Sequence, residues 1–474
     1  MSPARLAATA SSARRSVALL AAVLALAVLL GGCASTRPWI NAPLPGGVVT
    51  DDPDRLGAVS GVAFEDPSLL MAVTLSGGGA RAAAFGYGVL QALHDTPTAW
   101  NGRQTSLLDR VGFISGVSGG SIVAAYYAAF GAETFERFEP EFLRQNFQDS
   151  LISYALKPAS LVDLSSPWFG RSQLLARRLD ELYRGKTFAD MWARPGRPRL
   201  LVSATDLSLG SSFDFSWDQF TRICSDLGSV PLSFAVASSS AVPVVLSPVT
   251  LKNYAGSCHV PAAADMEAGE GRGDYRTRLL RSTRNSYQDA AARPFIHLVD
   301  GGVSDNLGVR SLLDRSMSQG GIRRAVRDLP RGVVRKLVLI TVNAERDPSE
   351  RIDESDKVPS TAQVIDAMLF GTGARATQET LGLLNDTARQ WKRELGSASD
   401  GKSSFADDAE IYVINVNLRD APEAMERSRL LQIPTAFSIP ADDVTRLIQA
   451  GRHVLESSPG YRDLLRSLPR PAAP

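Results

Sequence analysis

Residues 113–121, FISGVSGGS, contain the pattern Gly-x-Ser-x-Gly with Ser118 at its centre. The preceding run 110–115 predicts a buried strand, and the apolar run after Ser118 predicts a buried helix. A serine in a sharp turn between strand and helix exposes its hydroxyl, and the flanking Gly116 and Gly120 remove Cβ clashes from that turn. The pattern therefore predicts that Ser118 is a nucleophile, and the alternative is a small residue in a glycine turn.

A second glycine-rich turn, Gly77-Gly78-Gly79, directly follows the apolar run 69–76. Consecutive glycines allow backbone N–H groups to point into one concavity, which can stabilise the oxyanion of an acyl transfer, with Arg81 nearby. Phosphate binding is the competing interpretation, but the segment fits neither of the glycine-rich phosphate motifs. A tight strand-to-helix turn without chemical function is the remaining alternative.

A base for Ser118 is predicted at Asp300, which ends the apolar run 294–302 and precedes two glycines. A carboxylate that is desolvated at the same sheet edge as Ser118 could accept its proton directly. An Asx turn or a helix cap is the alternative for Asp300. The four histidines fit structural roles better, and they lie at His94, His259, His297 and His453.

These three motifs, in this order, resemble the patatin-like phospholipase family. The glycine loop GGGARA matches that family's loop at Gly77, Gly78, Gly79 and Arg81, although Ala82 stands where glycine is common. The segments 204–215 and 237–249 are also similar to family segments beside the site. The resemblance covers the motifs from about residue 69 to 310.

The resemblance implies an α/β fold with three layers, α/β/α, a mainly parallel central sheet, and a nucleophile elbow between a strand and a helix. It implies a Ser118–Asp300 dyad without histidine, an oxyanion hole at Gly77, Gly78, Gly79 and Arg81, and lipid acyl esters as substrates. We expect neither a metal nor a dissociable cofactor. Two alternatives stay open: an α/β-hydrolase-type esterase that uses His453, and a non-catalytic lipid-binding envelope lipoprotein.

The element pattern agrees with a parallel sheet, because the succession of strand, glycine turn and helix occurs twice near the start of the domain. Further strands are predicted at 199–207, 294–302, 336–344 and 410–418, and helices at 172–184, 361–369, 374–395 and within 440–468. The polar run 264–293 is predicted to be a solvated excursion.

The N-terminus has the layout of a secretory signal, with three arginines and no acid before the apolar run 17–30. This run is shorter than the roughly 20 residues that a membrane-spanning helix needs. It ends in Leu-Gly-Gly-Cys, which resembles a bacterial lipobox with Cys33 as the acylated residue, and Ala34 favours sorting to the outer membrane. We expect a lipid-anchored protein of the bacterial envelope facing the periplasm; an ordinary signal peptide is the alternative.

Four regions are predicted: a lipoprotein signal peptide at 1–32, a flexible tether at 33–66, a hydrolase domain at 67–440 and a C-terminal helical extension at 441–474. Cys224 and Cys258 remain as an even pair in an oxidising compartment and could form a disulfide. The formal net charge of +1 gives no electrostatic case for binding nucleic acid. Trp168 and Phe169 could contact lipid, although packing is the more common role of such aromatic residues.

Overall fold

The computed structural model describes residues 36–45, 66–194, 196–258, 275–346, 352–367, 372–397 and 403–469. Its centre is an eight-stranded sheet with the strand order β10-β9-β1-β4-β5-β8-β7, in which β6 also pairs with β5. A separate hairpin is formed by β2 and β3. The strands are β1 (Leu69–Leu75), β2 (Pro97–Trp100), β3 (Arg103–Ser106), β4 (Phe113–Val117), β5 (Arg199–Asp206), β6 (Ser211–Phe215), β7 (Val249–Lys252), β8 (Phe295–Val299), β9 (Val334–Asn343) and β10 (Phe405–Asn417).

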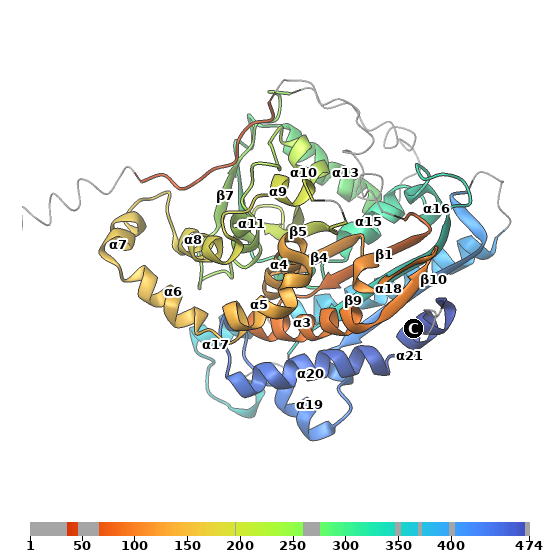
Figure 1. The fold of residues 1–474 in the computed structure, drawn as a ribbon. Coiled ribbons are helices and arrows are strands. Elements are labelled where there is room, and N and C mark those ends of the chain that lie inside the picture. Colours follow the sequence, from red (N-terminus) through yellow and green to blue (C-terminus); the bar gives the residue numbers. More distant parts are fainter. Residues whose placement is uncertain are drawn as a thin grey trace, which may run out of the picture.

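Helices cover both faces of the sheet, so the fold has three layers (Figure 1). The larger core cluster packs one face against α3 (Gly79–Asp95), α4 (Gly119–Phe130), α8 (Arg171–Tyr183), α11 (Leu232–Ser239) and α20 (Ala441–Ser457). The smaller cluster packs the other face against α15 (Arg310–Ser318), α16 (Ile322–Ala325) and α18 (Thr372–Gly396). The remaining α-helices are α5 (Thr134–Phe138), α6 (Phe147–Ala155), α7 (Pro158–Leu164), α9 (Phe188–Trp192), α10 (Trp217–Arg222), α13 (Tyr275–Gln288), α14 (Gly302–Asp305), α17 (Thr361–Asp366), α19 (Ala424–Leu431) and α21 (Pro459–Ser467).

The predicted α/β/α class with a mainly parallel sheet is confirmed. The strands β10, β9, β1, β4 and β5 run parallel, and the central strands β1 and β4 are largely buried because helices cover both faces of the sheet. The other strand pairs, β5 with β6, β5 with β8 and β7 with β8, are antiparallel. The short strands β6 and β7 were missing from the prediction, since neither has a long apolar run.

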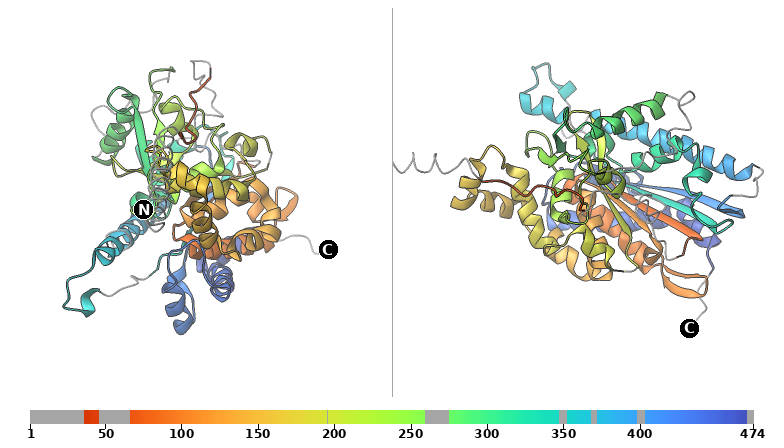
Figure 2. Two further views of the ribbon diagram at one scale, coloured as in Figure 1. Left: turned by 90° about the vertical axis from the view of Figure 1, so that its left-hand side faces the viewer. Right: turned by 90° about the horizontal axis from the view of Figure 1, so that it is seen from above.

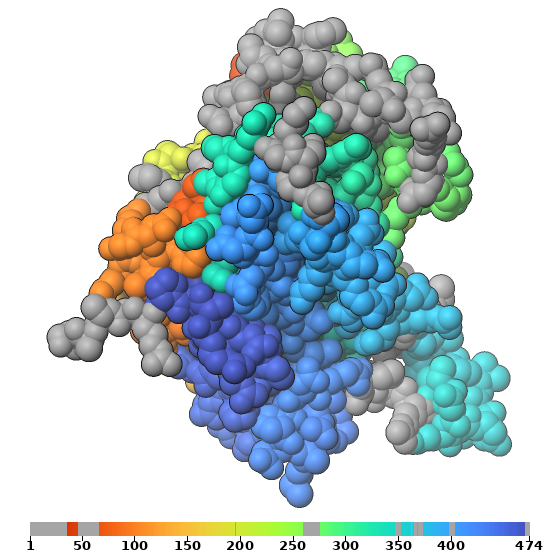
Figure 3. Space-filling model, turned by 90° about the vertical axis from the view of Figure 1, so that its right-hand side faces the viewer, coloured from red at the N-terminus to blue at the C-terminus, as the bar shows by residue number. Residues whose placement is uncertain are grey.

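The C-terminal helices, within the predicted extension at 441–474, pack against the rest of the described fold. Helix α20 packs backbone to backbone on α3: a Cβ added to Gly88 would lie 2.1 Å from the Ile448 carbonyl oxygen. A Cβ on Gly451 would likewise lie 2.2 Å from the Phe85 carbonyl oxygen. Figure 3 shows these C-terminal segments (dark blue) as part of one continuous surface with the early strands and helices (orange).

Residues 36–45, which lie within the predicted tether at 33–66, are hydrogen-bonded to the folded domain. The Asn41 side chain donates to the Ser225 hydroxyl at 2.8 Å and to the Lys252 carbonyl at 2.9 Å, and it accepts from the Lys252 amide at 2.7 Å. The Leu44 amide donates to the Cys224 carbonyl at 2.8 Å. This segment therefore covers part of the exposed edge of β7, which would otherwise leave backbone groups unpaired. The predicted signal peptide and Cys33 lie outside the described residues.

Candidate active site

Ser118 occupies the turn between β4 and α4 in a backbone conformation that few non-glycine residues adopt, with φ 47° and ψ −121°. Such a conformation costs about 1–3 kcal/mol and persists only where its surroundings hold it. The neighbouring glycines allow the close packing that does so. A Cβ on Gly116 would lie 2.4 Å from Ser121 Cα, and one on Gly120 would lie 2.4 Å from the Leu75 carbonyl oxygen. The turn therefore has the geometry of a nucleophile elbow.

Asp300 directly follows β8, and it lines the same pocket as Ser118, whose hydroxyl lies near enough to affect the pKa of its carboxyl. The sequence predicts this meeting from parallel strands that end at one sheet edge, but β8 runs antiparallel to β5. Strand register brings the two residues together instead. Val117 pairs with Ser203 and Val299 pairs with Thr205 along the same edge of β5, since β6 pairs along the opposite edge, so Ser118 and Asp300 meet beside Ala204.

Burial raises the pKa of Asp300 from its ordinary value of 3.8 to about 6. The Gly302 amide donates to Asp300 Oδ1 at 2.8 Å, and this bond and the nearby Ser118 hydroxyl lower the pKa in part. At neutral pH the carboxylate is therefore ionised, yet it binds a proton more strongly than an exposed aspartate does. These are the properties of a general base.

Ser239 joins the two residues through the backbone. The Ser118 amide donates to Ser239 Oγ at 2.8 Å, and that hydroxyl donates to the Ser203 carbonyl at 2.6 Å. The Ser239 carbonyl accepts from the Gly301 amide at 3.1 Å. The end of α11 thus fixes the elbow and the Asp300 turn together on β5. Sequence reasoning noted only the small residues of 237–249 here and missed this role.

The glycine loop lies directly against the elbow. A Cβ on Gly119 would lie 2.0 Å from the Gly79 carbonyl oxygen, and one on Gly77 would lie 3.4 Å from Ser118 Cβ. Gly78 and Gly79 have φ values of 138° and 60°, which favour glycine. Among the described residues, the Gly78 and Gly79 amides have no hydrogen-bond acceptor, whereas the Gly77 amide donates to the Asn306 carbonyl at 3.1 Å. Gly77 therefore departs from its predicted role as an oxyanion donor.

Arg81 also departs from its predicted role, because protein carbonyls occupy part of its guanidinium. Its Nε donates to the Ala344 carbonyl at 2.9 Å and its Nη1 to the Ile433 carbonyl at 2.6 Å. Burial, with the nearby Arg346 guanidinium, lowers the pKa of Arg81 to about 9. The side chain thus ties the glycine loop to the end of β9 and to the segment around residue 433, and it forms part of the pocket wall.

An open pocket leads to Ser118 and Asp300, and Val242, Pro243 and Val303 give it an apolar side. None of the three histidines in the described part of the chain lines it, and His259 lies outside that part. His453 is exposed on α20. The structure therefore does not bring the histidine of the alternative esterase mechanism to Ser118.

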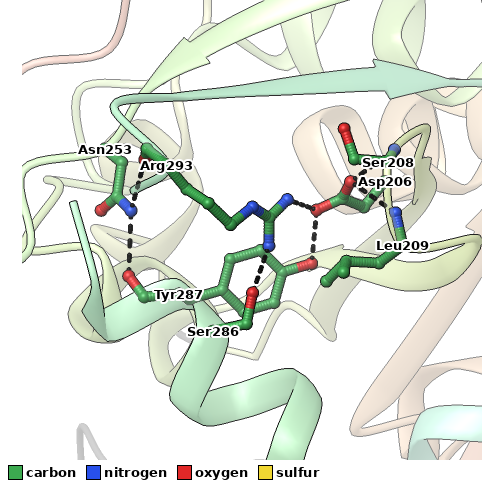
Figure 4. Close-up of polar contacts among 7 residues, drawn as sticks. All are labelled: Asp206, Ser208, Leu209, Asn253, Ser286, Tyr287 and Arg293. Carbon is green, nitrogen blue, oxygen red and sulfur yellow. Dashed lines mark hydrogen bonds and ion pairs between the residues drawn. The ribbon is translucent and has the colours of Figure 1, made fainter. Parts of the chain in front are cut away.

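A buried polar network holds β8 in place beside β5 (Figure 4). The Asp206 carboxylate accepts from the Tyr287 hydroxyl at 2.9 Å and from Arg293 Nη2 at 2.5 Å. Asn253 donates to the carbonyls of both residues. The prediction of a solvated excursion at 264–293 is therefore wrong for its last part, because α13 ends in the buried Tyr287 and this network binds it to the sheet.

The structure joins Cys224 and Cys258 in a disulfide with a Cα–Cα distance of 5.6 Å. No helix in the described part of the chain is long and apolar enough to cross a membrane. Phe169 is buried, whereas Trp168 is 43% exposed, so the two aromatic residues of this loop differ in environment.

The fold and the site place the chain among the α/β proteins that carry a serine nucleophile elbow on a mainly parallel sheet. A family model described as patatin-like phospholipase matches residues 73–313, about half of the chain. The chain therefore belongs to the patatin-like phospholipase family.

Comparison with solved structures gives more distant similarities. Human GIVD cytosolic phospholipase A2 has a TM-score of 0.48 and 15% identity, over 85% of this chain and 62% of that chain. VipD from Legionella pneumophila has a TM-score of 0.26 and 13% identity, over 81% of this chain and 67% of that chain. The chain thus spans less than two thirds of the human enzyme. No curated protein matches it.

Proposed function

We propose that the protein is a serine-dependent lipid acyl hydrolase of the phospholipase A type, which cleaves carboxyl esters of phospholipids or other acyl-ester lipids. One observation carries the proposal: Ser118, on a strained elbow, and the buried carboxyl of Asp300 line the same pocket, and the Ser118 hydroxyl lies near enough to lower the pKa of that carboxyl. Family membership supports a lipid as the acyl donor.

The proposed reaction is acyl transfer from the lipid to Ser118 and then to water. Asp300 accepts the proton of Ser118 Oγ as the oxygen attacks the ester carbonyl carbon. The tetrahedral intermediate collapses, and the leaving alcohol receives that proton from Asp300. A water molecule then gives a proton to Asp300 and attacks the acyl-enzyme. The carboxylic acid is released, and the proton returns to Ser118 Oγ.

The oxyanion of each tetrahedral intermediate would be stabilised by the amides of Gly78 and Gly79. Both have no other acceptor among the described residues, and they lie at the start of α3, where the helix dipole is positive. Removing one such donor typically costs about 10²–10³ in rate. Arg81 would contribute positive charge to the wall while holding the loop in position.

The proposal places the enzyme at the bacterial outer membrane, facing the periplasm and anchored through acylated Cys33. The lipobox-like sequence and the charge pattern of residues 1–32 support this location. Palmitate labelling of the wild type and of Cys33→Ala tests it, and equal labelling of the two would contradict it.

Hydrolysis of a panel of phospholipids and short soluble esters tests the activity, with Ser118→Ala and Asp300→Ala as the inactive variants. His453→Ala separates the two enzyme mechanisms. Full activity in that variant supports the dyad, whereas loss of activity would support the histidine mechanism. Failure of a fluorophosphonate to label Ser118 would favour the non-catalytic lipid-binding alternative.

A further inference from the structure

Exposed apolar side chains gather on one side of the molecule, around helices α6 and α7. These helices lie at the left-hand edge in Figure 1, and the left panel of Figure 2 views them from that side (yellow). We use the name α6–α7 surface for seven side chains that are between 37% and 67% exposed: Ile152, Leu156, Leu161, Val162, Trp168, Val244 and Val245.

These side chains come from two segments that contact each other. Arg171, at the start of α8, donates to the Val244 carbonyl at 2.7 Å, and the Ser172 hydroxyl donates to the Ser247 carbonyl at 2.5 Å. The loop that carries Trp168 is therefore next to the loop that carries Val244 and Val245. Ile152 of α6 and Leu156, which caps the C-terminus of that helix, are four residues apart and lie on the same side of it.

The α6–α7 surface borders the entrance to the candidate active site. Val242 and Pro243 line the pocket, and the chain continues directly into the exposed Val244 and Val245. On another side the pocket wall includes Thr435, and three residues later the Ser438 hydroxyl accepts from the Gln148 amide of α6 at 2.9 Å. The pocket wall is thus continuous with α6 on one side and with the exposed valines on the other.

The described N-terminal segment reaches the same surface. The Ser166 hydroxyl donates to the Thr36 carbonyl at 2.6 Å, and the Arg37 guanidinium lies 3.2 Å from the centre of the Trp168 ring. Cys33 precedes Thr36 by three residues, which can span at most about 11 Å. An acyl chain on Cys33 would therefore begin within about 11 Å of Thr36, on the side of the molecule that carries Trp168.

We propose that the α6–α7 surface docks on a lipid bilayer and places the entrance of the pocket at the membrane interface. Leucine, isoleucine and valine would enter the acyl boundary, and Trp168 and Lys157 suit the headgroup level. A bilayer is a better candidate for this surface than a protein partner, because an acylated Cys33 would hold this side of the molecule close to the membrane. The inference deepens the proposed function and rests on its lipid substrate.

The test compares two double variants of the full chain, both in a Cys33→Ala background. Leu156→Ser/Leu161→Ser removes apolar groups from the surface, and Met425→Ser/Val358→Ser removes apolar groups elsewhere that are even more exposed, at 89% and 93%. Each is assayed on phosphatidylcholine vesicles and on a short soluble ester. Relative to the Cys33→Ala protein, we expect the surface variant to hydrolyse vesicles at least about tenfold more slowly and to hydrolyse the soluble ester at the same rate. The control variant should keep both rates.

Equal vesicle rates in the two double variants would overturn the inference and leave a protein partner as the occupant of the surface. If the wild type hydrolyses neither substrate, the proposed function is refuted, but the docking inference is not. A second measurement then tests membrane docking without relying on activity. Vesicles of brominated phosphatidylcholine should then quench wild-type tryptophan fluorescence more than that of Trp168→Phe. Equal quenching would overturn the docking proposal.

Discussion

Replacing Asp300 by asparagine should lower activity by about 10²–10⁴-fold and, at neutral pH, stabilise the folded protein. Burial raises the pKa of Asp300 from 3.8 to about 6, so the folded protein disfavours the ionised carboxylate that the reaction needs. A rise of this size corresponds to about 3 kcal/mol of lost stability once the group is ionised in both states. Asparagine keeps the shape and can still accept from the Gly302 amide, but it never ionises.

The pH dependence of this gain follows from the direction of the pKa change. The folded pKa lies above the unfolded one, so the contribution of the carboxyl to stability is fully present below about pH 4 and is lost as the pH rises through 6. Urea unfolding of the wild type and of Asp300→Asn should therefore give similar stabilities near pH 4. The variant should be more stable by up to about 3 kcal/mol at pH 8.

The pH dependence of the activity should also report the ionisation of Asp300. Wild-type kcat/KM on a soluble ester should fall about tenfold per pH unit below pH 6, and Asp300→Asn should be about 10²–10⁴-fold less active at pH 8 and should not show this fall. Asp305→Asn is the matched control: burial also raises the pKa of Asp305 to about 6, but its carboxylate accepts from the amides of Leu307 and Arg310. The reasoning is refuted if Asp300→Asn retains activity, or if Asp305→Asn removes the fall below pH 6.

Three further substitutions test how the site is held together. Ser239→Ala should lower stability by about 1–3 kcal/mol in urea unfolding and reduce kcat, because the Ser118 amide loses its buried acceptor; an unchanged kcat and unfolding midpoint would contradict this role. Gly119→Ala should slow fluorophosphonate labelling of Ser118 by at least about 10²-fold, since its Cβ would overlap the glycine loop; wild-type labelling would show that the two turns are not in contact. Cys224→Ser should lower the free energy of unfolding by about 4 kcal/mol, from a loop separation of 34 residues, and keep ester hydrolysis; wild-type stability would argue that the disulfide does not form.

Much of the fold was predictable because parallel strands that are covered on both faces are long apolar runs. The prediction at 199–207 matches β5, and the prediction at 336–344 matches β9 to within two residues. The same logic failed for β7, which has only four residues, and for the buried end of α13, whose polar sequence gives no sign of its contact with Asp206.

The sequence predicts which residues form the candidate site better than it predicts how they are arranged in space. The motif spacing pointed to Ser118 and Asp300, but not to the antiparallel direction of β8, which depends on long-range pairing with β5. The roles of Ser239 and Arg81 depend on backbone carbonyls far away in the sequence. The local sequence pattern carries no information on such partners, because the residues around a buried serine or arginine do not depend on which distant carbonyl accepts its hydrogen bond.

The most direct test of the central claim is to label the protein with a long-chain alkyl fluorophosphonate and locate the adduct by peptide mass spectrometry. The account predicts one adduct, on Ser118, which forms in the wild type at pH 8 and is slowed at least about 10²-fold in Asp300→Asn. An adduct on another residue, or equal labelling rates in the two proteins, would contradict it.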